Sequence, residues 1–192
     1  MFLKPRINPE LPALILQGER VMLRPPVPAD WPQWAEVRGR NRAYLKPYEP
    51  SWPDDCLTRA FFERRLQKQA RDWRAGLGHS FLVLKDGELI GGVNLNNVCR
   101  GAAQYAALGY WLAEDAQGHG YMTGALRLAI DYGFTHLTLH RFNAGCLPGN
   151  ERSVKLLSRL GFTEEGFARN YVQIDGRWQD HRLFGLNVED WK

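Results

Sequence analysis

Two glycines, Gly118 and Gly120, have the spacing expected of a phosphate-binding loop. They follow a strand-like run at residues 106–112, and apolar residues at every fourth position of 126–134 indicate one face of a helix. Glycines leave backbone N–H groups accessible. The first N–H groups of a helix have no partner inside it, and the helix dipole adds partial positive charge. We therefore expect residues 117–123 to bind a pyrophosphate group.

Glycines alone are weak evidence, because a tight turn between a strand and a helix explains them equally well. The loop is not a Walker loop, since no Gly-Lys-Ser/Thr follows it. The dinucleotide spacing G-x-G-x-x-G fails at Thr123. These exclusions leave another class of nucleotide-diphosphate ligand, of which coenzyme A is one.

Length and composition indicate one globular domain covering residues 1–192, of which 44% are hydrophobic. The net charge of +4 and the pI near 9.1 suit a polyanionic cofactor or an RNA-rich partner, but scattered surface charge explains them as well. Nothing indicates sequence-specific nucleic-acid binding.

Three distant cysteines predict neither a disulfide framework nor a metal site, and they favour a reducing compartment. With no signal peptide or membrane-spanning run apparent, we expect a cytoplasmic protein that does not insert into membranes.

The order of the expected elements predicts a mixed α/β domain with a central sheet of about seven strands and about four helices. Asp-Gly pairs at 86–87 and 175–176 predict hairpin turns. Residues 1–18, with three prolines, are expected to form an extended arm. The expected strands are 21–25, 81–84, 89–95, 106–112, 139–146, a strand ending at 174, and 178–188; the expected helices begin near 30, 57, 121 and 150.

Two of these segments carry more specific expectations. Asp30 is placed to cap the first helix. Phe61, Leu66 and Trp73 are expected to mark the buried side of the long helix. Three prolines and three aromatic residues within 44–53 predict a stiff, irregular loop, either a lid packed on the core or a wall facing the substrate.

The glycine loop, taken with a second block, resembles the GCN5-related N-acetyltransferase (GNAT) family. Gln117 and Gly120 match the family motif Arg/Gln-x-x-Gly-x-Gly/Ala, although Met122 stands where Gly or Ala is usual. Residues 150–162 resemble the next block, Asn-x-x-Ser followed by a helix ending in Leu-Gly-Phe. The resemblance implies the family fold, in which two adjacent middle strands splay apart to hold coenzyme A.

Three segments also resemble the RimJ subgroup of bacterial ribosomal-protein-alanine acetyltransferases. They are residues 41–50, 117–122 and 171–181, and the likeness spans about 18–191. The loop of that subgroup has the form Gly-Leu-Met, which makes Met122 less anomalous. The blocks are specific for the superfamily and fairly specific for the subgroup, but not for one substrate.

The resemblance implies transfer of an acetyl group from acetyl-CoA to an amine without a metal. Backbone groups of residues 110–112 would bind the pantetheine arm, and an N–H near Leu112 would stabilise the oxyanion. Lys155 and Arg159 either reach the phosphates or form a solvated helix face. The residues expected at the cofactor are Tyr110, Trp111, Leu112, Gln117, Gly118, His119, Gly120, Tyr121, Met122, Thr123, Asn150, Lys155 and Arg159.

The same resemblance suggests three catalytic candidates. Ser153 would donate a proton to the leaving thiolate, although capping of the helix explains its position equally well. Glu49 would receive the substrate amine, and Tyr171 is a reserve donor whose alternative is a buried strand aromatic. A related subgroup carries a glutamate where this chain has Val172, which leaves the general base open. An α-amine with a pKa of about 7.7–8.0 is partly neutral at pH 7 and needs only a modest base.

Three functions remain open at this stage. The first is acetylation of the N-terminal alanine α-amine of a ribosomal or other protein, with possible ribosome association. The second is acetylation of a small amine such as a polyamine, an antibiotic or an aminoacyl conjugate. The third is a non-catalytic module that binds acetyl-CoA or the ribosome. An open groove beside residues 44–52 and the hairpin at 175–176 would favour a peptide, whereas a closed acidic pocket would favour a small amine. The oligomeric state is left open.

Overall fold

The computed structural model describes residues 11–192, which form five α-helices and eight strands. The sheet exceeds the expected size by one short strand, and the helices by one short helix within residues 41–48. The strands are β1 (Leu16–Gln17), β2 (Met22–Arg24), β3 (His79–Lys85), β4 (Glu88–Cys99), β5 (Tyr105–Leu112), β6 (Arg141–Cys146), β7 (Thr163–Ile174) and β8 (Arg177–Asn187). The helices are α1 (Trp31–Arg40), α2 (Arg42–Leu45), α3 (Arg59–Arg74), α4 (Tyr121–Thr135) and α5 (Glu151–Arg159).

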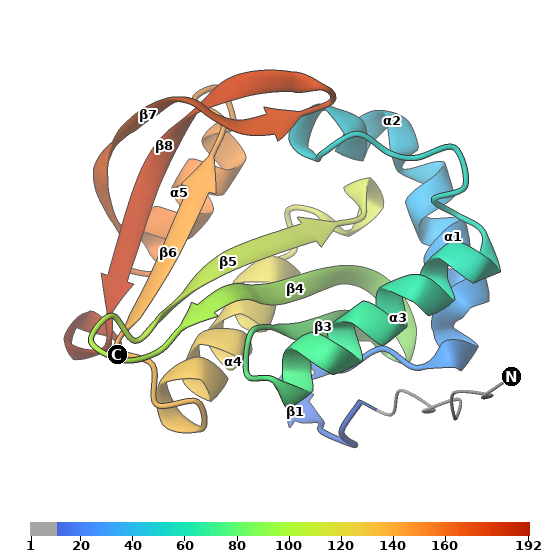
Figure 1. The fold of residues 1–192 in the computed structure, drawn as a ribbon, viewed down its shortest axis with the longest axis horizontal. Helices are drawn as coiled ribbons and strands as arrows, with labels where there is room; N and C mark the ends of the chain where they lie inside the picture. Colours follow the sequence, from blue (N-terminus) through green and yellow to red (C-terminus); the bar gives the residue numbers. More distant parts are fainter. Residues whose placement is uncertain (1–10) are drawn as a thin grey trace, which may run out of the picture.

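The strands lie in one mixed sheet with the order β1-β2-β3-β4-β5-β6-β8-β7. Neighbouring strands are antiparallel except for β5 and β6, which run parallel. In the described chain, β5 and β6 pair over three positions, the last joining Ala107 to Asn143. Beyond that pair the two strands diverge, as Figure 1 shows. The predicted splay of two middle strands is confirmed, and it leaves one backbone edge of residues 108–112 available to a ligand.

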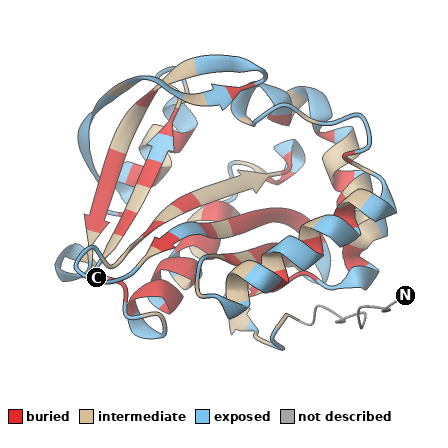
Figure 2. Ribbon diagram, in the orientation of Figure 1, coloured by how far each residue is buried: buried red, intermediate tan, exposed pale blue. Residues whose placement is uncertain are grey.

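Two apolar layers, one on each face of the sheet, hold the helices in place. The larger lies under α4 and α5, and the smaller packs α1 and α3 onto the outer strands of the sheet. Alternate residues of β3 point into different layers. Phe81 and Val83 belong to the larger layer, and Leu82 and Leu84 belong to the smaller one. Figure 2 shows the resulting buried strip through the centre of the sheet, with β7 largely exposed.

The buried face of α3 agrees with the prediction at Leu66, and Trp73 packs partly buried against the core, but Phe61 does not belong to this face. Thr58 caps the helix by accepting a hydrogen bond from the Phe61 backbone N–H at 3.2 Å. The buried residues are Phe62, Leu66 and Ala70, which recur every four positions. Phe61 is only partly buried, because it precedes Leu66 by five positions, which places it about 140° away around the helix.

The N-terminal arm and the first helix also depart in part from expectation. Residues 1–10 of the expected arm lie outside the described chain, and Leu16 pairs with Leu23 in an edge strand. Asp30 stands at the expected cap position, but its carboxylate accepts hydrogen bonds from Arg24 and from the Val27 backbone N–H. Asp30 therefore fixes the chain leading into α1 rather than the first turn of the helix.

The segment expected to be an irregular loop, residues 44–53, begins with ordered helical turns. The end of α2 continues into a 3-10 turn at Lys46–Tyr48. Asn41 holds this region to the centre of the molecule, because its side-chain oxygen accepts a hydrogen bond from the Glu114 backbone N–H at 2.8 Å. That bond joins the α1–α2 junction to the residues directly after β5.

Cys56, Cys99 and Cys146 are all free thiols, as their spacing predicted. In the described part of the chain, no helix combines the length and apolar character that crossing a membrane requires.

Candidate active site

The glycine loop joins β5 to α4, and its backbone needs both glycines. Gly118 and Gly120 have φ angles of 77° and 78°, in the left-handed region that other residues seldom adopt. Gly120 is the N-cap of α4, which begins at Tyr121. The first N–H groups of α4 are therefore left without helical partners at the end of the loop. Local backbone conformation thus produces the predicted helix start with N–H groups free of helical partners.

A cavity of about 590 Å³ lies between the end of β5, the start of α4, α5 and the α2 region. All the residues predicted at the cofactor except His119 line it, as do the predicted Ser153 and Glu49. The complete lining is Tyr44, Leu45, Tyr48, Glu49, Tyr110, Trp111, Leu112, Ala116, Gln117, Gly118, Gly120, Tyr121, Met122, Thr123, Asn150, Arg152, Ser153, Lys155, Leu156 and Arg159.

Two predicted site residues lie apart from this cavity. The side chain of His119 is exposed, and its backbone carbonyl accepts a hydrogen bond from Arg20 at 2.6 Å. Tyr171 is 54% exposed on β7, where its ring contacts His181. It is neither a cavity donor nor the buried strand aromatic that was its alternative. The register shift between Ala168 and Val172 interrupts the alternation on which that alternative relied.

Gln117 joins the two walls of the cavity. Its amide nitrogen donates to the Tyr44 hydroxyl of α2, and its amide oxygen accepts from Arg152 of α5 at 2.6 Å. Arg152 was not predicted at the site. It precedes Lys155 by three residues and Arg159 by seven, so helical spacing places the three cations on one face of α5. This spacing is a sequence signal that could have identified it.

Ser153 of α5 and Tyr110 of β5 form a hydroxyl pair in the wall of the cavity. Their oxygen atoms are 2.6 Å apart. Burial raises the pKa of Tyr110 to about 12, although the bond to Ser153 opposes the shift. The side-chain oxygen of Asn150 caps α5 by accepting a hydrogen bond from the Ser153 backbone N–H at 3.1 Å. The pair is neutral at physiological pH and can donate a proton or a hydrogen bond into the cavity.

Glu49 lies in the opposite wall, where three hydrogen bonds from two side chains hold its carboxylate. Arg38 donates two hydrogen bonds to it, at 2.7 and 2.6 Å, and the Trp52 indole N–H donates a third at 2.8 Å. The Arg38 guanidinium also lies over the rings of Trp52 and Trp111, at 4.2 and 4.9 Å. Glu49 is therefore a positioned hydrogen-bond acceptor whose charge is already paired.

The donor set of the cavity suits coenzyme A. The glycine loop and three α5 cations offer N–H groups and positive charge to phosphates, and the splayed strand edge offers backbone groups to a pantetheine arm. Within residues 11–192, no cluster of three or more His, Cys, Asp or Glu side chains has metal-binding geometry. The fold and the cavity together define an acyl-CoA-dependent transferase.

Residues 20–163 match the acetyltransferase (GNAT) domain family, and the chain belongs to this family. It is therefore an N-acetyltransferase, and acetyl-CoA is its acetyl donor. It is 35% identical over 187 residues to a [ribosomal protein uS5]-alanine N-acetyltransferase of Escherichia coli, covering 94% of each chain.

The chain is also similar to solved structures, of which two are RimJ-type enzymes. A Mycobacterium smegmatis RimJ in complex with CoA-disulfide has 33% identity and a TM-score of 0.85, covering 88% of this chain and 82% of that one. A ribosomal-protein-S5-alanine acetyltransferase from Vibrio fischeri has 32% identity and a TM-score of 0.86, covering 93% and 99%. The resemblance to the family, and to its RimJ subgroup, is confirmed.

Proposed function

We propose that this enzyme acetylates the N-terminal α-amine of a protein, with the N-terminal alanine of a ribosomal protein as its substrate. One observation carries the chemistry: a single cavity contains the glycine loop, the Tyr110–Ser153 hydroxyl pair and the Glu49 carboxylate. The choice of acceptor is supported by the two ribosomal-protein-alanine acetyltransferases to which the chain is similar over nearly their whole length.

In this proposal, bound acetyl-CoA supplies an acetyl thioester that the amine attacks directly. Glu49, held by Arg38 and Trp52, accepts a hydrogen bond from the incoming amine and orients it. An N–H near Leu112 polarises the carbonyl. Ser153 donates a proton to the sulfur as the carbon–sulfur bond breaks, and Tyr110 restores the proton to Ser153. The proton that the amine nitrogen releases after its attack returns to Tyr110 through solvent, so the hydroxyl pair ends the cycle neutral.

The composition of the cavity favours an α-amine over a polyamine. Of the described residues that line it, Glu49 alone carries a carboxylate, and that charge is paired with Arg38. A polyamine would need several unpaired carboxylates to replace its hydration. An α-amine, partly neutral at pH 7, needs one positioned acceptor.

We use the name acceptor side for the part of the cavity around Glu49, where the amine would enter. There, hydrogen bonding and an ion pair join two segments that are distant in the sequence. The Asp175 backbone N–H, at the tip of the β7–β8 hairpin, donates to the Glu49 carbonyl at 2.9 Å, and Lys46 lies 3.5 Å from the Asp175 carboxylate. Figure 1 shows the hairpin reaching to α2 across the molecule. We propose that the acceptor N-terminus enters beneath this bridge, beside the residues that resemble the RimJ subgroup.

A ribosomal-protein substrate would place the enzyme in the cytoplasm. The net charge of +4 would favour its approach to the polyanionic ribosome. Ribosome association is therefore part of the proposal.

The test is acetyl transfer from acetyl-CoA to a panel of peptides and small amines, with mass spectrometry locating the acetyl group. We expect acetylation of the α-amine of alanine-terminated peptides. The matched control is the same peptide with a blocked N-terminus and a free lysine, which should remain unmodified. Modification of polyamines or lysine side chains in preference to the α-amine would contradict the proposal.

A further inference from the structure

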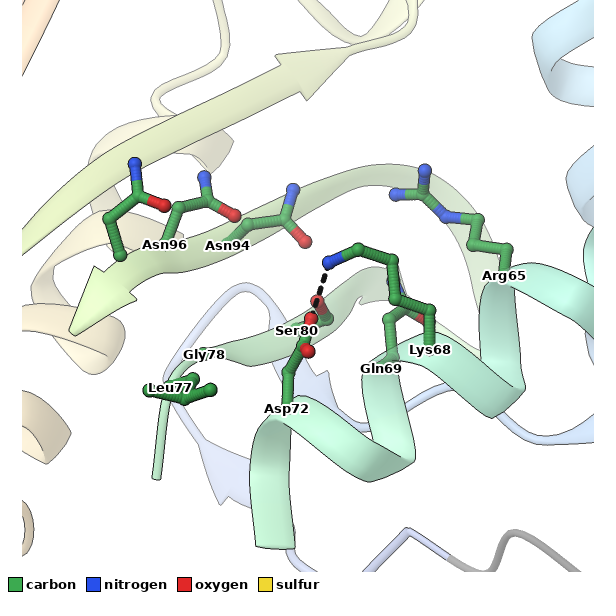
Figure 3. Close-up of a pocket in the computed structure, with 10 residues that line it drawn as sticks. Arg65, Lys68, Gln69, Asp72, Leu77, Gly78, Ser80, Asn94 and Asn96 are labelled. Atoms are coloured by element: carbon green, nitrogen blue, oxygen red, sulfur yellow. Dashed lines mark hydrogen bonds and ion pairs between the residues drawn. The ribbon is translucent and has the colours of Figure 1, made fainter. Parts of the chain in front are cut away.

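A second cavity, of about 510 Å³, lies outside the site described above. It is formed between α3 and the face of β3 and β4 opposite α4 (Figure 3). Arg65, Lys68 and Gln69 line it from the helix, while Ser80, Asn94 and Asn96 line it from the sheet. Its walls are polar on both sides, although most of α3 packs through apolar residues. Nothing in the proposed chemistry uses this cavity.

The cavity contains a cation that no carboxylate of the described chain pairs. Lys68 is 2.5 Å from Asp72, and the neighbouring Arg38 is paired with Glu49. Arg65 makes no hydrogen bond or ion pair with any residue of 11–192, although it is partly buried. Burial, together with the Arg38 guanidinium, lowers the pKa of Arg65 to about 10, and Glu49 opposes the shift. The wall therefore carries one desolvated and uncompensated positive charge.

A second group in the same wall lacks a partner. The Gln69 side-chain oxygen is buried and accepts no hydrogen bond from the described residues. The Gln69 oxygen, a hydrogen-bond acceptor without a partner, and the unpaired Arg65 guanidinium suit a ligand that offers both an N–H group and a negative charge. A peptide segment with an acidic side chain offers both.

The position of the cavity relates it to the acceptor side. A small crevice shares Arg65 and Asn94 with the second cavity and Trp111 with the first. Two β4 residues that line the second cavity pair with β5: Asn94 with Gly109 and Asn96 with Ala107. This cavity therefore lies beside the part of β5 that precedes Trp111. From Trp111 to Ala107 the strand advances about 13 Å, the length of four extended residues. An acceptor whose amine is near Trp111 would place its residues 2–5 along this wall.

We propose that this cavity is an acceptor subsite, in which Arg65 binds the carboxylate of an acidic side chain within residues 2–5 of the acceptor. The inference rests on the proposed function and adds a sequence preference to it. The Gln69 oxygen accepts a backbone N–H of the same segment. Arg65 is thus a specificity residue that does not take part in the acetyl transfer.

The experiment compares alanine-terminated peptides with Glu or Gln at one position at a time from 2 to 5. Each pair competes in one reaction, so the ratio of kcat/KM does not depend on the amount of folded enzyme. At one position the wild-type enzyme should favour Glu over Gln by about 10- to 100-fold, as expected for a charge-assisted hydrogen bond. Arg65→Gln should reduce that ratio to near one, and Arg65→Lys should keep part of it.

Arg71→Gln is the matched control, since it removes the same charge from an exposed position of α3 outside the cavity and should keep the full ratio. A wild-type ratio near one at every position, or a preference that survives in Arg65→Gln, would overturn the inference while leaving α-amine acetylation intact. Failure to acetylate any peptide would instead overturn the proposed function, and the inference with it.

Discussion

The two sides of the active-site cavity are constructed differently. The cofactor side comes from two short segments, 110–123 and 150–159, whose backbone conformation is set by glycines and helix caps. The acceptor side joins α1, α2 and the β7–β8 hairpin through side-chain pairs and one backbone hydrogen bond, with Glu49 at the point where they meet. In the proposed site, local conformation would therefore determine where the acetyl donor binds, and contacts between distant segments would determine which amine it meets. We infer that the acceptor side can change without loss of the cofactor side.

The largest expected effect is on the cofactor side, in Gly120→Glu. A carboxylate at the start of α4 would oppose the pyrophosphate, and we expect acetyl-CoA affinity to fall about a thousandfold. Calorimetric titration and the shift in Tm on adding acetyl-CoA measure it. Gly101→Glu is the control, because Gly101 also has a positive φ, 70°, and has free space around it away from the cavity. Equal affinity in the two variants would remove the loop from the site.

A smaller effect is expected where the two sides meet, in Ser153→Ala. Loss of the proton donor should lower kcat about a hundredfold while the Kd for acetyl-CoA stays near that of the wild type. Steady-state kinetics with an alanine-terminated peptide, together with calorimetry, separate the two quantities. Ser158→Ala, an exposed change on the same helix, should leave both unchanged. An unaltered kcat in Ser153→Ala would exclude the serine as proton donor.

The smallest effect is expected on the acceptor side, in Glu49→Gln. The amide keeps the shape but loses the charge that orients the amine, so we expect kcat/KM for the peptide to fall about tenfold. Acetyl-CoA affinity should not change. Glu36→Gln, on an exposed position of α1, controls for loss of charge. If acetyl-CoA affinity fell with kcat/KM, the separation of the two sides would be wrong.

The cofactor side was predictable because its signals are local. The left-handed backbone of the loop occurs at Gly118 and Gly120, and the cap of α5 is Asn150. Each of these features depends only on residues within one helical turn. The strands flanking the loop were equally visible, since hydrophobic runs and Asp-Gly turns report short-range structure. Arg152 was missed although the helical spacing of the α5 cations placed it at the site.

The acceptor side was less predictable because its members meet only in three dimensions. Glu49 was predicted at the site, but its fixed position comes from Arg38, eleven residues earlier, and from the backbone N–H of Asp175. Tyr171 was placed incorrectly, because a register shift in β7 moved it to an exposed position that no sequence periodicity reports.

The sequence by itself determined the glycine loop between a strand and a helix, the mixed α/β order of elements and the likeness to the acetyltransferase family. These follow from backbone preferences and from periodicity over a few residues. The tertiary structure alone decided that Tyr110 meets Ser153, that Glu49 is paired with Arg38, and that Arg65 faces a second cavity. The residues of each pair come from different elements of the fold, so their contact depends on how the sheet and its helices pack. The same packing forms the second cavity.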